Sequence, residues 1–226
     1  MIDASHLSLK EGDKGGAPAY ARNDNSITGK IGQVKPLDEL IREAEVAHGH
    51  LCAGQILGVR MAMLGLAKLG IDDPRGKDRK RLVTFVEIDR CATDAIGVVT
   101  GCRLGKRALK FRDWGKMAAT FVDVQEDRAV RVAAKESSKA LAKQMYPELA
   151  DKNQQQMRAY REMPDDDLFD TQWVKVTLPP EEFPGYKAER VVCSQCGEGI
   201  NFNREVRRGE SVLCRACAGE AYYEVI

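Results

Sequence analysis

Four cysteines near the C-terminus constrain the fold more than any other feature of this sequence. They form two Cys-x-x-Cys pairs, Cys193/Cys196 and Cys214/Cys217, with seventeen residues between the pairs. Each pair can supply two thiolates to one tetrahedral Zn²⁺, and this spacing is typical of structural zinc sites. A segment of about forty residues buries too little apolar surface to fold alone, so the metal must contribute much of its stability. We therefore expect a four-cysteine zinc finger of treble-clef or ribbon type over residues 191–226, with iron as the alternative ion because four thiolates also suit it.

The charge balance of this finger argues against nucleic-acid binding. From residue 190 to the end, five arginines face five glutamates, and four thiolates with Zn²⁺ add two negative charges. Binding to phosphates relies on a surplus of Lys and Arg that replaces counterions. We expect the finger to dock on the core domain or on a protein partner instead.

A second group of metal-ligating and acid–base side chains lies within five residues, at His48-Gly49-His50-Leu51-Cys52. The apolar spacing before it (36–47) and after it (53–69) predicts two helices, so the group sits at their joint. Cys52 then falls near a helix N-terminus, where the partial positive charge favours a thiolate. A metal or catalytic role is favoured over the alternative, in which the histidines line a turn and Cys52 is a small core residue.

The second of these helices carries small residues on one face. Gly54, Gly58 and Ala62 are spaced by four, and each glycine weakens a helix by about 1 kcal/mol relative to alanine. Tight packing is the expected compensation. The spacing therefore predicts a second backbone close to this face, either from the same chain or from a second subunit.

Another candidate site follows the first predicted strand. Residues 81–90 are β-branched and aromatic, and they deliver Cys91 at the end of the strand. A third helix then runs to about residue 100 and places Asp94 one turn beyond Cys91, so that the two side chains can converge. The alternative is a buried thiol with an aspartate that compensates the helix dipole.

The remaining pattern predicts an α+β core. Strands are expected at 108–112 and 116–125, joined by a turn at 113–115, and then at 129–134 and 172–178, with helical segments between. We predict a flexible N-terminal arm (1–34), a core of helices packed on a mixed or antiparallel sheet (35–178), a Pro-rich linker (179–190) and the finger (191–226).

Composition limits the function classes. Charged residues make up 31% of the 226 residues and the net charge is +1, which gives no global bias toward nucleic acid or membrane. The apolar run 51–69 is interrupted by Gln55, Arg60 and Lys68, which favours a buried helix over a membrane span. Residues 1–30 contain no apolar signal-peptide core, so we expect a cytoplasmic protein whose seven cysteines serve metal or thiol chemistry rather than disulfides.

Together these residues carry a resemblance to the FmdE family, which takes its name from a component of formylmethanofuran dehydrogenase. The resemblance spans most of 36–226 and rests on His48-Gly49-His50, Cys52, Gly54, Arg60, Arg90-Cys91, Asp94-Ala95-Ile96, Thr100-Gly101-Cys102, Gly105-Lys106 and Gly115-Lys116. It implies an α+β core, a homodimer, and an active site around His48, His50, Cys52, Cys91 and Asp94, with Cys102 a weaker candidate. Family members often have Cys-Pro-Gly where this chain has Cys52-Ala53-Gly54, and losing the proline loosens the turn but leaves the candidate ligands.

Two function classes remain open. In the first, His50, Cys52 and Cys91 hold a divalent metal with one open position, and His48 acts as general acid–base; a metal-free variant makes Cys52 or Cys91 a thiolate nucleophile. In the second, the chain is a non-catalytic accessory subunit, metal carrier or sensor, and the finger docks a partner such as an oxidoreductase subunit. A nucleic-acid-binding regulator is disfavoured by the charge of the finger.

Overall fold

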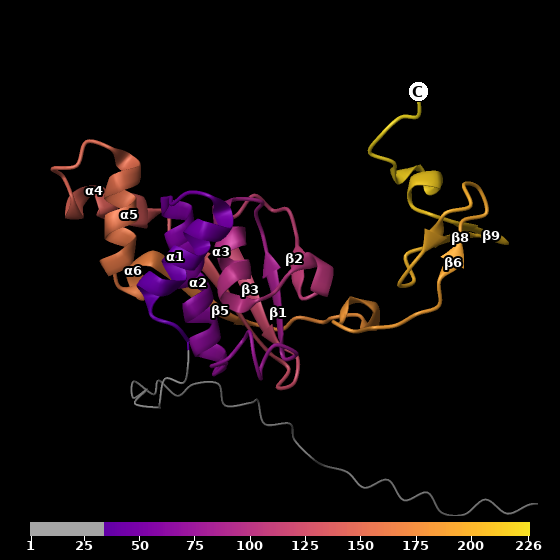
Figure 1. Ribbon diagram of the computed structural model, residues 1–226, viewed down its shortest axis with the longest axis horizontal. Helices are drawn as coiled ribbons and strands as arrows, with labels where there is room; N and C mark the ends of the chain where they lie inside the picture. The colour runs from indigo at the N-terminus through magenta and orange to yellow at the C-terminus, as the bar shows by residue number, and fades with distance from the viewer. Residues whose placement is uncertain (1–33) are drawn as a thin grey trace, which may run out of the picture. The chain divides into compact units, whose positions relative to one another are not determined.

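A five-stranded mixed sheet forms the centre of the core domain in the computed structural model, which describes residues 34–226. Its strands are β1 (Leu82–Val86), β2 (Leu109–Phe111), β3 (Ala118–Asp123), β4 (Arg128–Ala134) and β5 (Phe169–Val174). They lie in the order β2-β1-β3-β4-β5, and only β1 and β2 are parallel (Figure 1). The predicted α+β class with a mixed sheet is confirmed, whereas the expected N-terminal arm lies outside the described residues except for its last position.

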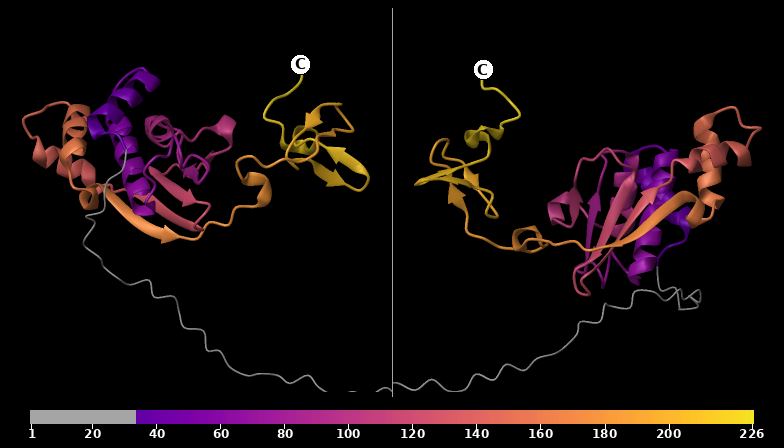
Figure 2. Two further views of the ribbon diagram at one scale, coloured as in Figure 1. Left: turned by 60° about the horizontal axis from the view of Figure 1, so that its bottom comes forward. Right: turned by 180° about the vertical axis from the view of Figure 1, so that it is seen from behind.

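Helices cover one face of this sheet, as Figure 2 shows from two sides. They are α1 (Leu37–His48), α2 (Ala53–Leu69) and α3 (Cys91–Thr100), and α2 packs directly on β3 and β4. Between β4 and β5 the chain adds α4 (Ser137–Met145), α5 (Lys152–Glu162) and α6 (Asp165–Leu168). Helix and sheet side chains, among them Ile56, Leu66, Phe121 and Val130, form one apolar core with no more than 1% of their surface exposed.

The small residues of α2 meet α3 of the same chain. A Cβ built on Gly58 would lie 2.4 Å from the carbonyl oxygen of Ala92, far inside any real contact distance. Gly65 similarly leaves room only for the Phe121 ring, 2.2 Å from a built Cβ. The close backbone approach predicted from the glycine spacing is therefore satisfied within the chain.

The expected turn between residues 108–112 and 116–125 is wrong as a hairpin. Strand β2 pairs in parallel with β1 on one side, and β3 pairs antiparallel with β1 on the other side. The connecting segment crosses the end of β1, where the N–H groups of Trp114 and Lys116 both donate to the Glu87 carbonyl at 3.1 Å. Because β1 exposes hydrogen-bonding groups on both edges, it separates two strands that follow each other in sequence.

The last strand of the core begins and ends earlier than predicted from 172–178. Phe169 is buried and opens β5, which ends at Val174. The residues that follow pack against the second face of the sheet, where Val176 and Leu178 contact a cluster of Val83, Val122 and Ala129. These residues are apolar because they cover the sheet, although they do not extend it.

The C-terminal module consists of short elements. After the turn η2 (Pro180–Glu182) come β6 (Val191–Val192) paired with β7 (Gly199–Ile200), β8 (Val206–Arg208) paired with β9 (Ser211–Leu213), and a helical turn η3 (Ala216–Glu220). No helix within residues 34–226 is long and apolar enough to cross a bilayer.

Candidate metal centres

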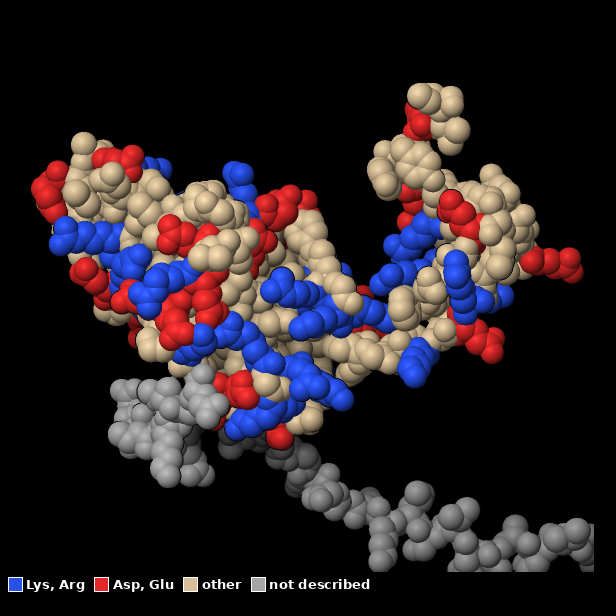
Figure 3. Space-filling view, in the orientation of Figure 1, with Lys and Arg blue, Asp and Glu red and all other residues tan. Residues whose placement is uncertain are grey.

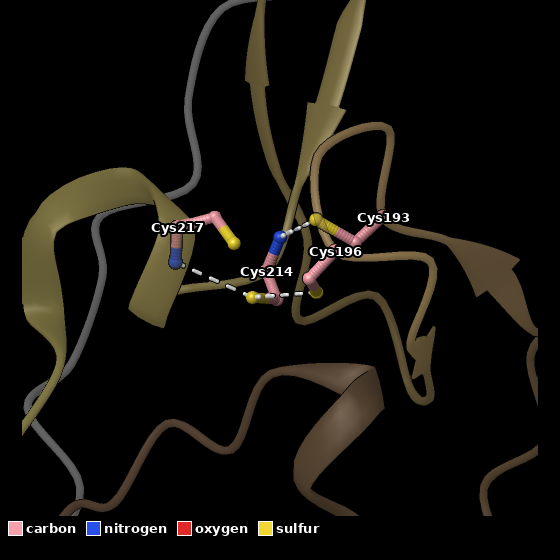
Figure 4. A group of neighbouring side chains, drawn as sticks. All are labelled: Cys193, Cys196, Cys214 and Cys217. Atoms are coloured by element: carbon pink, nitrogen blue, oxygen red, sulfur yellow. Dashed lines mark hydrogen bonds between the residues drawn. The ribbon is translucent and has the colours of Figure 1, made fainter. Parts of the chain in front are cut away.

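The four cysteines of the C-terminal module converge on one point (Figure 4). Their sulfur atoms lie within 4.8 Å of one another, and the Cys196 and Cys214 sulfurs are 3.9 Å apart. Four sulfurs placed tetrahedrally at about 2.3 Å from Zn²⁺ would be about 3.8 Å apart. The donor set and its spacing therefore fit a zinc ion held by Cys193, Cys196, Cys214 and Cys217.

Backbone N–H groups prepare these sulfurs for a cation. The N–H groups of Cys214 and Cys217 point at the sulfurs of Cys193 and Cys214, at 3.3 and 3.4 Å. Hydrogen bonds from the backbone of Cys196 and Cys214 lower the pKa of Cys193 to about 6, whereas the hydrogen bond to Cys214 raises the pKa of Cys217 to about 12. Adjacent thiols resist ionising together, so a divalent cation is required for all four to become thiolates.

A second group of donors forms in the core domain from His48, His50 and Cys91, whose ligating atoms lie within 4.8 Å of one another. His48 is the last residue of α1, His50 lies in the loop before α2, and Cys91 is the first residue of α3. Gly49 ends α1 with a φ of 94°, and the two imidazole rings lie 4.7 Å apart at 47° to each other. Two imidazoles and one thiol are a donor set that suits zinc or a related divalent metal.

Asp94 orients one of these histidines. Its carboxylate oxygen lies 2.8 Å from Nδ1 of His48, across the gap between α3 and α1. When Nδ1–H donates to the carboxylate, Nε2 of His48 is left as the free donor, which is the arrangement found at most metal-ligating histidines. The sequence placed Asp94 beside Cys91, whereas the structure gives it His48 as its hydrogen-bond partner.

Cys52 lies beside this group rather than in it. The expected ligand set was His50, Cys52 and Cys91, but His48 occupies the third place in the structure. Cys52 precedes α2, with its φ and ψ in the extended region. Burial and a hydrogen bond with Cys52 raise the pKa of the Cys91 thiol, which disfavours Cys91 as a thiolate nucleophile in the absence of a metal.

Cys102 is remote from the group. It follows the C-terminal end of α3, whereas Cys91 begins that helix. Its side chain is buried, and its sulfur accepts a hydrogen bond from the Thr84 hydroxyl at 3.5 Å. Burial raises the pKa of this thiol, so Cys102 has the features of a core residue.

Two residues near the group were not predicted from the sequence as part of it. Gln55 is fully buried and donates from Nε2 to the Cys91 carbonyl at 2.8 Å, which fixes the start of α3. Asn153, from α5, accepts the N–H of Ala53 at 3.3 Å. An amide inside an otherwise apolar helix was a usable signal for Gln55, but nothing local in the sequence indicates Asn153.

Arg60 belongs to the fold rather than to the site. It donates to the Tyr160 and Met163 carbonyls and pairs with Asp165, so it ties α2 to α5 and α6. This contact accounts for one carboxylate of the Asp165–Asp167 triplet without a bound cation.

Comparison with known families agrees with this geometry. Residues 47–170 match the model of the FmdE family, described as molybdenum formylmethanofuran dehydrogenase operon, and residues 187–223 match the prokaryotic dksA/traR C4-type zinc finger. The first match contains His48, His50 and Cys91, and the second contains all four finger cysteines.

Two individual proteins extend the comparison. A probable S-adenosyl-L-methionine-binding protein of Archaeoglobus fulgidus is 32% identical over 213 residues, which is 84% of this chain and 55% of that protein, so the chain spans about half of its relative. A tungsten formylmethanofuran dehydrogenase FmdE-like protein from Syntrophus aciditrophicus has a similar fold, with a TM-score of 0.59 at 22% identity over 87% of this chain and all of that one.

Proposed function

Because the chain belongs to the FmdE family and carries a C4-type finger, we propose that it is a metal-dependent enzyme whose core site is built from His48, His50 and Cys91. The observation that carries this proposal is the convergence of three strong donor atoms within 4.8 Å of one another, from three separate segments. The finger zinc serves stability, because all four of its cysteines are occupied as ligands and leave no open position.

Three protein ligands are the usual complement of a catalytic zinc site, which keeps a fourth position for water or substrate. A divalent metal bound there supplies Lewis acidity and lowers the pKa of a bound water. The side chains around it supply orientation and access. His50 is exposed and the Asp94 carboxylate is 61% exposed, so a substrate can approach from solvent.

The surrounding residues divide the remaining tasks. Asp94 accepts the Nδ1–H of His48 and fixes the direction of its ring, and Gln55 fixes the Cys91 backbone. Since His48 is then a ligand, the general acid–base role expected for it passes to Asp94 or Cys52. Both lie next to the donor group, and each can hold a proton there.

The exposure of the site also favours a second candidate, a metal carrier or sensor subunit. A metal bound near the surface can be passed to a partner protein, and the finger offers a docking element for an oxidoreductase subunit. In this alternative a homodimer presents two such sites.

The deciding experiment counts metal per chain by plasma mass spectrometry in wild type and in the His50→Ala/Cys91→Ala variant. We expect about two metal ions per chain in the wild type and about one in the variant, which retains the finger zinc. About one ion in both proteins would refute the core metal site.

A second measurement separates enzyme from carrier. An enzyme should turn over a member of a panel of carbonyl and thiol compounds only when the core metal is present. S-adenosyl-L-methionine belongs in the panel because the archaeal relative is named for it. A carrier should instead release its core metal to a chelator while the finger zinc stays bound.

A further inference from the structure

A cavity of about 470 Å³ lies in the core domain, with lining residues that extend to the C-terminal end of α3. Its walls come from α1, from the loop between α2 and β1, and from the segment after α3, which includes the short turn η1 (Leu104–Lys106). Five basic side chains and one acidic side chain line it, namely Arg75, Arg79, Lys80, Arg103, Lys106 and Glu43. The lining charge is strongly positive, although the whole chain carries only +1.

The acidic residue does not neutralise the cavity. Glu43 is already paired with Lys35 and Arg75, both at 2.5 Å, and these bonds hold the pKa of its carboxyl below the usual range. The other four cations (Arg79, Lys80, Arg103 and Lys106) form no ion pair with any carboxylate of residues 34–226. In Figure 3, Lys and Arg side chains gather on the part of the core domain around the start of β1 and β2.

The shape and the apolar lining indicate the kind of anion. A volume of several hundred Å³ is that of a small-molecule site. The apolar part of the lining is aliphatic, from Pro74, Val98 and Ala108, and none of the lining residues is aromatic. Single-stranded nucleic acids are held by aromatic residues that stack on bases, so this lining suits a compact anion better.

We propose that this cavity binds a small phosphorylated molecule through the side chains of Arg79, Lys80, Arg103 and Lys106. The lining includes the C-terminal cap of α3, Gly101, and a helix C-terminus carries partial negative charge. Side-chain cations, and no helix N-terminus of α3, must therefore hold the anion. The site is distinct from the His48–His50–Cys91 group, and the proposal does not depend on a core metal.

The test is calorimetric titration of the full metal-loaded chain with fructose 1,6-bisphosphate, with fructose as the uncharged control. We expect saturable binding of the bisphosphate at about 50 mM NaCl that weakens at least tenfold at about 300 mM, because the interaction is a screened charge contact. Fructose should give no binding.

Variants locate the site. Arg103→Gln/Lys106→Gln and Arg79→Gln/Lys80→Gln remove charge from two separate segments, and each should weaken binding by at least about tenfold. The matched control Lys143→Gln/Lys152→Gln removes two exposed lysines from α4 and α5 and should bind as the wild type does.

Three results would overturn the proposal. These are no binding of the bisphosphate at low salt, equal binding by the cavity variants and the control, or tighter binding of a short DNA duplex that the same cavity variants abolish. Because the two cavity variants change different segments, the misfolding of one would leave the other to decide.

Discussion

Nδ1 of His48 lies 2.8 Å from the carboxylate of Asp94, although the two residues are 46 positions apart in the chain. The contact joins the end of α1 to the first turn of α3, and it turns the remaining nitrogen of His48 into the available donor. It also explains why Asp94 belongs to the site without being one of the three donors that converge.

Removing the Asp94 carboxylate should therefore weaken the core metal without affecting the finger. We expect Asp94→Ala to lower core-metal affinity by about 10- to 100-fold, the usual effect of losing a carboxylate that orients a ligating histidine. Asp94→Asn, which can still accept the hydrogen bond, should fall between Asp94→Ala and the wild type. Competition with a chromogenic chelator measures this, and Asp89→Asn, an exposed carboxylate nearby in sequence, is the control.

Single substitutions can distinguish Cys91 from Cys52 as the sulfur ligand. Cys91→Ser should release the core metal, because Cys91 is the only cysteine among the three converging donors. Cys52→Ser should retain it, since Cys52 lies beside the group. Metal content after gel filtration reports both, and equal loss from the two variants would restore the ligand set expected from the sequence.

The contact of Gly58 with α3 predicts a loss of stability on adding one methyl group. Gly58→Ala should lower the free energy of unfolding by about 1–3 kcal/mol, because the new Cβ meets the Ala92 backbone. This would occur although alanine favours a helix by about 1 kcal/mol over glycine. Thermal unfolding followed by circular dichroism measures the change. Gly105→Ala, where a built Cβ meets nothing within 4 Å, should be nearly neutral, and similar melting of both variants would contradict the packing argument.

The buried carboxyl of Asp123 predicts a pH-dependent contribution to stability. Burial opposes its ionisation, but hydrogen bonds from Arg81 and from the Gln125 and Glu126 N–H groups outweigh burial and lower its pKa. A lowered pKa stabilises the fold above the unfolded value of about 3.9, and this contribution is lost as the pH falls through the folded value.

Asp123→Asn should accordingly lower the free energy of unfolding by about 3 kcal/mol at pH 7, because it leaves the Arg81 guanidinium without its partner. The difference from wild type should shrink as the pH falls below about 4. Urea denaturation of both proteins at each pH measures it, so that any loss of zinc at acid pH is shared. A difference that stays constant with pH would mean that packing, not charge, is responsible.

Several parts of this protein followed from the sequence alone. The finger cysteines were identified from two Cys-x-x-Cys pairs, because ligand spacing within a knuckle is a local property. The apolar period and the flanking glycines gave α2 and α3 their observed ends, at 53–69 and 91–100. In each case the deciding interactions lie within a few residues of one another.

The tertiary structure decided what depends on contacts between distant segments. It placed β2 and β3 on opposite edges of β1, brought the Ala92 backbone against Gly58, and put His48 rather than Cys52 with His50 and Cys91. Strand partners and ligand sets depend on the direction in which each helix and strand packs. A local period of 2 or 3.6 residues specifies which face is buried, but the partner of that face is set only when the whole core closes.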